Sequence, residues 1–202
     1  MISRNSPRVR LARARAEKLA RLATRPALWT AARQGVVASV EHAGIPFRDA
    51  YGTIYDIGAS RGQFALFAAD RFPDATLICC EPIPSSRETL RQVLGDRIEI
   101  RPVAVGAQAG TADLQLSASD DSSSLLPIGD RQVAEFPGTQ ATGTISVDVI
   151  PASDLLDPAS PGPRLMKIDV QGLELEVLRG CGDAISLIDD VFVECSFVEL
   201  YE

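Results

Sequence analysis

The stretch that decides the fold is TIYDIGASRGQF, residues 53–64. β-Branched and aromatic residues run up to Asp56 and predict a buried strand, and Gly58 and Gly62 then break the pattern. From Phe64 onward, apolar residues recur with the spacing of a helix. A tight loop between a strand and a helix can bring backbone N–H groups close to a nucleotide-like ligand. The stretch therefore predicts such a site at the carboxyl end of a first strand.

Strands and helices alternate through most of the chain. Buried strands are expected at Thr53–Ile57, Thr76–Cys80, Ile98–Val105 (interrupted by Pro102), Leu165–Val170 and Val191–Cys195. Helices are expected from Phe64 to near Arg71, at Pro84–Leu94, and from Leu173 to Arg179 with Gly180 as its stop. This alternation predicts an α/β fold with a doubly wound, mostly parallel sheet.

The middle of the chain follows a different pattern. Thr111–Ser117 and Thr144–Val149 alternate between apolar and polar residues, which predicts an inserted antiparallel strand pair with one exposed face. Between them, Asp120–Ser124 and a loop rich in Gly, Pro and Thr form a long connection. Connections of this length usually carry function or are mobile.

Residues 1–50 are expected to form N-terminal helices, and residues 51–202 a binding domain. Residues 1–33 carry eight Arg and one Lys against Glu17 alone, a balance of +8, and apolar spacing predicts a second helix over Pro26–His42. The basic helix is expected to be a solvated structural element, with an anion, membrane or targeting role as the alternative.

Composition narrows the class of protein. The net charge of the whole chain is −7, so residues 34–202 carry −15, which argues against nucleic acid as the main ligand. No apolar run approaches the roughly 20 residues of a membrane span. The four cysteines lack metal-ligand spacing, so we expect no metal site and reduced thiols in a cytoplasmic protein.

The loop after the first strand departs from the dinucleotide-binding fingerprint. That motif requires Gly at positions 58, 60 and 63, and this chain has Ser60 and Gln63. Asp56, just before the loop, suits a cationic group such as the ammonium of an amino acid moiety. Glu81 follows Gly58 by 23 positions, and a carboxylate about 20 residues on can accept hydrogen bonds from a ribose diol.

A third polar cluster ends the fourth strand. Strand alternation puts Lys167 and Asp169 on one face, with Asp169 at the carboxyl end where open sheets bind ligands. Charged groups in an apolar strand are costly unless they are paired or face a cleft. Glu174 either serves this site or sits in the first turn of a helix, where the helix dipole favours an acid.

Together these motifs resemble the FkbM family of S-adenosylmethionine-dependent methyltransferases. The matching segments are 55–64, Glu81-Pro82, 104–106, 121–125, 167–174, 194–197 and 199–201, in the family's order. Two positions depart from the family pattern, because Ser60 stands where Asn is common and Gln171 where Glu is common. We therefore assign no base or metal role to Gln171.

The resemblance implies a class I methyltransferase fold and a set of site residues. The methionine part of the cofactor would be surrounded by Asp56, Gly58, Ala59 and Gly62, its ribose would bind Glu81, and its adenine would lie near Val103 and Ala104. Independently of the resemblance, the Asp120–Ser124 loop, with Ser122 and Ser123, is expected to cover the acceptor pocket, and Glu174 is expected to contact the acceptor. A polar turn without function is the alternative for the loop, and His42 is expected to be structural.

The sequence therefore predicts methyl transfer from S-adenosylmethionine to a hydroxyl of a small molecule or sugar, with Asp169 as the base. Two alternatives are a nicotinamide-dependent oxidoreductase and a non-catalytic interaction protein that keeps the fold. Class I methyltransferases usually add a sixth strand and an antiparallel seventh, and this chain ends at Glu202. A truncated chain is expected, or a fifth strand whose edge is covered by the N-terminal helices or a partner.

Overall fold

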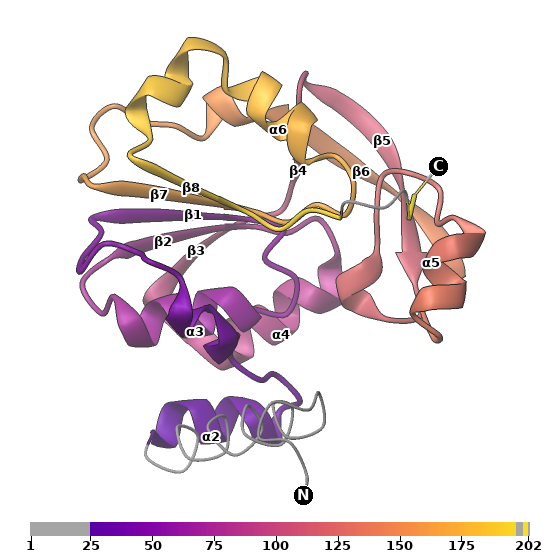
Figure 1. Ribbon diagram of the computed structural model, residues 1–202, viewed down its shortest axis with the longest axis horizontal. Helices are drawn as coiled ribbons and strands as arrows, with labels where there is room; N and C mark the ends of the chain where they lie inside the picture. The colour runs from indigo at the N-terminus through magenta and orange to yellow at the C-terminus, as the bar shows by residue number, and fades with distance from the viewer. Residues whose placement is uncertain (1–24, 197–199, 202) are drawn as a thin grey trace, which may run out of the picture.

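A computed structural model describes residues 25–196 and 200–201, and its centre is a sheet of five parallel strands in the order β3-β2-β1-β7-β8 (Figure 1). The strands are β1 (Thr53–Ile57), β2 (Thr76–Cys80), β3 (Ile98–Arg101), β7 (Arg164–Ile168) and β8 (Asp190–Val193). The helices around them are α2 (Pro26–Arg33), α3 (Gln63–Arg71), α4 (Pro84–Leu94) and α6 (Glu174–Cys181). The predicted α/β fold class, with its mostly parallel sheet, is confirmed.

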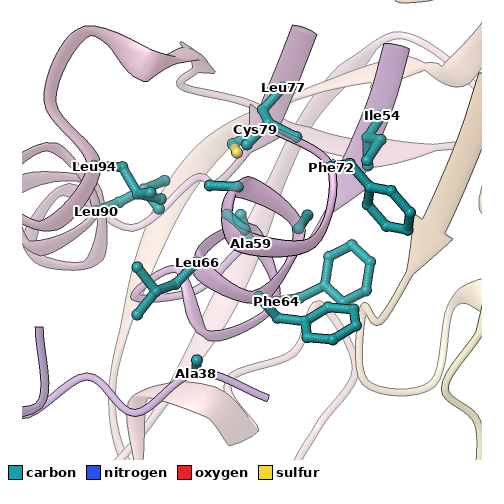
Figure 2. Close-up of a cluster of buried hydrophobic side chains, with 14 of the residues drawn as sticks. Ala38, Ile54, Ala59, Phe64, Leu66, Phe72, Leu77, Cys79, Leu90 and Leu94 are labelled. Atoms are coloured by element: carbon teal, nitrogen blue, oxygen red, sulfur yellow. The ribbon is translucent and has the colours of Figure 1, made fainter. Parts of the chain in front are cut away.

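The alternation of side chains along β1 produces two cores, one on each face of the sheet. Ile54 belongs to a cluster with α3 and α4, and Tyr55 to a cluster with α6 on the opposite face. Figure 1 shows α3 and α4 on one side of the sheet and α6 on the other. Figure 2 shows side chains of the first cluster, among them Phe64 and Leu66 of α3, Leu90 and Leu94 of α4, and Leu77 and Cys79 of β2. Every residue of β1 is buried, as expected for the middle strand of a covered parallel sheet.

The expected third strand, Ile98–Val105, is in fact two strands in two different sheets. Ile98–Arg101 pairs with β2 as β3, whereas Ala104–Gly106 forms β4 beside β6 (Ala141–Pro151) in a second sheet. Pro102 lies between them, and proline has no N–H to continue a strand ladder. The break sends the chain from the parallel sheet into the insert.

The inserted antiparallel pair is confirmed. β5 (Gly110–Ser117) pairs with β6 in an antiparallel ladder. Gly110 lies opposite Val149 at one end of the ladder, and Ser117 lies opposite Ala141 at the other. The connection between them contains the 3-10 turn η3 (Asp120–Ser122) and the helix α5 (Asp130–Glu135). The second sheet therefore has the order β4-β6-β5 and lies beside the carboxyl ends of the parallel strands (Figure 1).

The expected helix over Pro26–His42 is shorter than predicted. α2 ends at Arg33, and Gly35 takes a left-handed backbone conformation with φ +80° that ends the helix. The chain then forms the 3-10 turn η1 (Val40–Gly44). Leu28, Ala31 and Ala38 of this segment pack into the same cluster as α3. The predicted basic helix before residue 25 lies outside the described residues.

The sequence predicted that Gly180 stops the last helix, but the helix continues past it. α6 runs to Cys181, and Gly182, with φ +50°, follows it. A Cβ at Gly180 would lie 2.0 Å from the carbonyl oxygen of Gly106, so this glycine allows α6 to pack directly on β4. The remaining 3-10 turns are η2 (Gly95–Arg97), η4 (Ala152–Asp154) and η5 (Gly182–Leu187).

The strand β8 lies at an edge of the sheet, as expected, and the segment before β1 contacts it. Arg48 and Tyr51 both reach the carboxylate of Asp190 at the start of β8, and the His42 ring lies 5.0 Å from the ring of Phe192. Among the described residues, no helix combines the length and apolar character that crossing a membrane requires.

Candidate active site

A cavity of about 320 Å³ opens at the carboxyl ends of the parallel strands. Seven of the predicted site residues line it: Gly58, Ala59, Glu81, Val103, Ala104, Ser123 and Asp169. Four others are not part of its lining: Asp56, Gly62, Ser122 and Glu174. The fold thus gathers residues from four strand ends and the insert around one space, where open α/β sheets bind ligands.

The loop after β1 turns sharply at three alternate positions. Gly58, Ser60 and Gly62 all have positive φ, at +77°, +48° and +98°. A Cβ at Gly58 would lie 1.9 Å from the carbonyl oxygen of Asp169, and one at Gly62 would lie 2.5 Å from Leu90. Gly58 therefore allows the loop to touch the Asp169 segment, and Gly62 allows α3 to pack on α4.

Glu81 ties this loop to the end of β2. Its carboxylate accepts the Ser60 N–H at 2.8 Å and the Ile83 N–H at 2.7 Å, and the residue is 4% exposed. Burial raises the pKa of Glu81 to about 7, although both backbone hydrogen bonds oppose the shift. Each carboxylate oxygen keeps a further acceptor site, so the group can still accept two hydroxyl donors from the cavity.

Lys167 is the centre of a buried charge cluster at the cavity floor. Its Nζ lies 3.3 Å from Oδ1 of Asp56 and 3.5 Å from Oδ2 of Asp169, and it donates to the Gly58 carbonyl at 3.3 Å. Burial lowers the pKa of Lys167, but the nearby carboxylates outweigh burial and hold it above its usual range. The ammonium that Asp56 faces in this structure is therefore that of Lys167.

Asp169 faces the cavity and is held from two sides. Lys167 approaches one carboxylate oxygen, and the Gln171 Nε2 donates to the other at 2.7 Å. Burial raises the pKa of Asp169, with Lys167 acting in the opposite direction. Its side chain is 25% exposed, so the carboxylate remains accessible to a molecule in the cavity.

Gln171 connects Asp169 to the insert and to the C-terminal segment. Its Oε1 accepts the Tyr201 hydroxyl at 2.8 Å, and its carbonyl accepts the Ser124 hydroxyl at 2.7 Å. The same Tyr201 hydroxyl lies 3.3 Å from the Ser122 carbonyl. Gln171, to which the sequence assigned no base or metal role, thus orients Asp169 and is itself held by residues distant in the chain.

The remaining predicted residues mainly support loops. Glu174 accepts the N–H groups of Val170 and Gly172 at 3.2 and 3.0 Å, and so closes the turn before α6. The Ser123 hydroxyl accepts the Ser117 N–H at 3.1 Å. The acceptor contacts predicted for Ser122, Ser123 and Glu174 stay predictions.

Three ionisable residues that the sequence did not place in the site also line the cavity: Glu41, Glu194 and His42, which was expected to be structural. His42 Nε2 lies 3.4 Å from Oε1 of Glu194, and its ring contacts Phe64 at 5.7 Å between centroids. No local pattern marks this pair, because its two members are 152 positions apart. Within the described part of the chain, no group of His, Cys, Asp and Glu side chains could hold a metal ion.

The parallel sheet, its glycine loop and the cavity at the strand ends define a Rossmann-like α/β protein of the class I methyltransferase type. A family model described as a methyltransferase FkbM domain matches residues 56–202. The chain therefore belongs to the FkbM methyltransferase family.

Three curated relatives cover about 70% of this chain or slightly more. Methyltransferase 1 of Beauveria bassiana is 30% identical over 162 residues, and the match spans 63% of its length. The 2-O-methyltransferase NoeI of Sinorhizobium fredii is 29% identical over 158 residues, spanning 74% of this chain and 65% of the relative. The hexuronic acid methyltransferase AglP of Haloferax volcanii is 25% identical over 144 residues and is matched over 54% of its length. The chain thus spans less than two thirds of each of these relatives.

Proposed function

We propose that this chain is an S-adenosylmethionine-dependent methyltransferase that acts on a hydroxyl group of a sugar or another small molecule. Membership of the FkbM family supports methyl transfer. The relative named as a 2-O-methyltransferase supports an oxygen acceptor, and the relative named as a hexuronic acid methyltransferase supports a sugar. The observation that carries the proposal is a single cavity lined by both Glu81 and Asp169.

The residues around the cavity fit this cofactor chemically. Five carboxylates line it against Lys167, which favours a ligand that carries positive charge. Glu81 can accept the two hydroxyls of a ribose, and Gly58 and Ala59 line the space proposed for the methionine part. Val103 and Ala104 offer an apolar surface to the adenine. Asp56 and Gly62 would support this site from behind, through Lys167 and α4.

The bound cofactor would supply a methyl group already activated by its sulfonium. The protein then has to hold the acceptor hydroxyl in line with that group and take up its proton. Asp169 is the proposed base, because it faces the cavity and its oxygens keep acceptor sites. Its raised pKa makes it a stronger base than an exposed aspartate, while Lys167 and Gln171 keep it oriented.

Titration of S-adenosylmethionine and of NAD into the protein tests the cofactor. We expect S-adenosylmethionine to bind and to raise the melting temperature, and NAD to do neither. Stabilisation by NAD alone would favour an oxidoreductase. Binding of neither would favour a non-catalytic protein that has kept only the fold.

The substitution Asp169→Asn tests the base. Turnover with a panel of sugars and polyols is expected to fall by about 10²–10⁴-fold, because a positioned base contributes that much. The dissociation constant of S-adenosylmethionine should stay within about threefold of wild type, since a factor of three is under 1 kcal/mol. Asp113→Asn on β5 is the control, because Asp113 is exposed and outside the cavity lining. Normal turnover of Asp169→Asn would remove this residue from the catalytic machinery.

A further inference from the structure

The part of the cavity beyond the cofactor lies over β7 and β8. The strand order β3-β2-β1-β7-β8 puts Glu81 and the glycine loop on one side and Asp169 and Glu194 on the other. His42 of η1 lies 3.4 Å from Glu194 on this second side, and its neighbour Glu41 also lines the cavity. If the cofactor binds as proposed above, on which this inference rests, the acceptor has to enter over β7 and β8.

Negative charge dominates this side of the cavity. The charged groups in and directly under it whose contacts are known are Asp56, Asp169, Glu194 and Lys167. With these acids ionised and His42 neutral, three carboxylates and one ammonium carry a net charge of −2. Asp121 of the insert adds a further carboxylate to the lining.

The positive groups of this side are already engaged. Lys167 is 3% exposed and lies between Asp56 and Asp169, at 3.3 and 3.5 Å. His42 lies 3.4 Å from Glu194. Among the described residues, no Arg and no other Lys lines the cavity, so an acceptor carboxylate or phosphate would meet no available cation there.

The acids of this side already repel one another. Burial raises the pKa of Glu194, and the charge of Asp169 raises it further. An anionic acceptor would add one more negative charge to the same partly buried space. A hydroxyl group, by contrast, can donate a hydrogen bond to either carboxylate.

We infer that the acceptor is uncharged, a neutral sugar or polyol whose hydroxyls donate to Asp169 and Glu194, and that uronates and sugar phosphates are excluded. In this respect the chain differs from its Haloferax relative, which is named for a hexuronic acid. The cofactor leaves this preference in place, because the sulfonium offsets only one of the negative charges. The selectivity is therefore set by this chain's own carboxylates.

Matched glycoside pairs test the inference by binding. Methyl glucoside and methyl glucuronide differ only in a CH₂OH against a carboxylate, and galactose and mannose give equivalent pairs. Each is titrated by ligand-detected NMR into protein saturated with S-adenosylhomocysteine. At least one neutral member should bind about tenfold or more tightly than its uronide. Equal or tighter binding of the uronides, or no binding of any neutral glycoside, would overturn the inference.

A charge reversal at the rim tests whether the effect is local. Glu41→Lys is expected to strengthen uronide binding by about tenfold. Glu88→Lys is the control, because it makes the same change in net charge at an exposed position of α4 outside the cavity lining, and it should have no effect. Equal effects of the two variants would contradict a local origin. The titration of S-adenosylhomocysteine separates the two proposals: its failure to bind rejects the proposed function, whereas tight uronide binding beside it rejects this inference alone.

Discussion

The two halves of the cavity are built in different ways. The half over β1 and β2 comes largely from residues 58–83, a short continuous stretch. The half over β7 and β8 combines residues 37–42, 121–125, 167–173 and 194, which are far apart in the chain. The first half is a local strand–loop–helix motif, whereas the second exists only after the chain has folded.

The anchoring of the two main carboxylates differs in the same way. Glu81 is held by backbone N–H groups of Ser60 and Ile83. Asp169 is held by the side chains of Lys167 and Gln171, and Gln171 in turn depends on Tyr201 and Ser124. Side-chain anchors change with single substitutions, so the comparison teaches that the acceptor half can vary while the cofactor half stays fixed.

The largest effect is expected where the two halves meet, at Lys167. The substitution Lys167→Met leaves Asp56, whose side chain is 2% exposed, without its cation, and should cost about 3–5 kcal/mol in the free energy of unfolding. Urea unfolding measures this loss. Arg179→Met breaks an exposed pair with Glu176 and should cost no more than about 1 kcal/mol. Equal losses in the two variants would mean that Lys167 does not organise the cavity floor. The double variant Asp56→Asn/Lys167→Met should recover part of the stability, because it no longer buries an unpaired carboxylate.

A second prediction concerns the backbone-anchored half. Glu81→Gln should weaken S-adenosylmethionine binding by about 10–100-fold, the usual value of hydrogen bonds to a charged group. Because the pKa of Glu81 is about 7 and the ionised form accepts the ribose hydroxyls, wild-type affinity should fall as pH drops from about 8 to about 6. Calorimetric titration across this range measures both effects. Glu81→Gln lacks the titrating carboxyl. If the affinity of this variant depended on pH as much as that of wild type, Glu81 would be excluded as the source of the pH dependence.

The smallest effect is expected for Tyr201→Phe. It removes the hydroxyl that holds Gln171 at 2.8 Å and should cost about 0.5–1.5 kcal/mol of stability and a few-fold in turnover. Cofactor affinity should not change, because Tyr201 contacts only the acceptor half. Tyr55→Phe serves as control. Tyr55 packs in the core between the parallel sheet and α6, outside the cavity lining, and the variant loses a hydroxyl contact with Ser160 at 3.2 Å. A loss of turnover in both variants would point to general destabilisation.

Local patterns in the sequence predicted the parallel strands well because apolar runs and glycine turns are local signals. Pro102 was visible, but only the fold revealed that it divides one apolar stretch between two sheets. The sequence wrongly predicted Gly180 to be a helix stop. Its actual role is to let α6 pack on Gly106, which is 74 positions away and therefore gives no local signal. The pair of Lys167 and Asp169 was expected from strand alternation, whereas His42 and Glu194 carried no local signal.

The sequence by itself determined the α/β class, the glycine loop and the position of Glu81 after β2, because each depends on residues close together in the chain. The tertiary structure alone decided that Asp56 faces Lys167, that Tyr201 holds Gln171, and that η1 and the insert complete the cavity. These contacts join residues that only the packing of strands, helices and insert brings together. The character of the acceptor half is therefore a property of the fold.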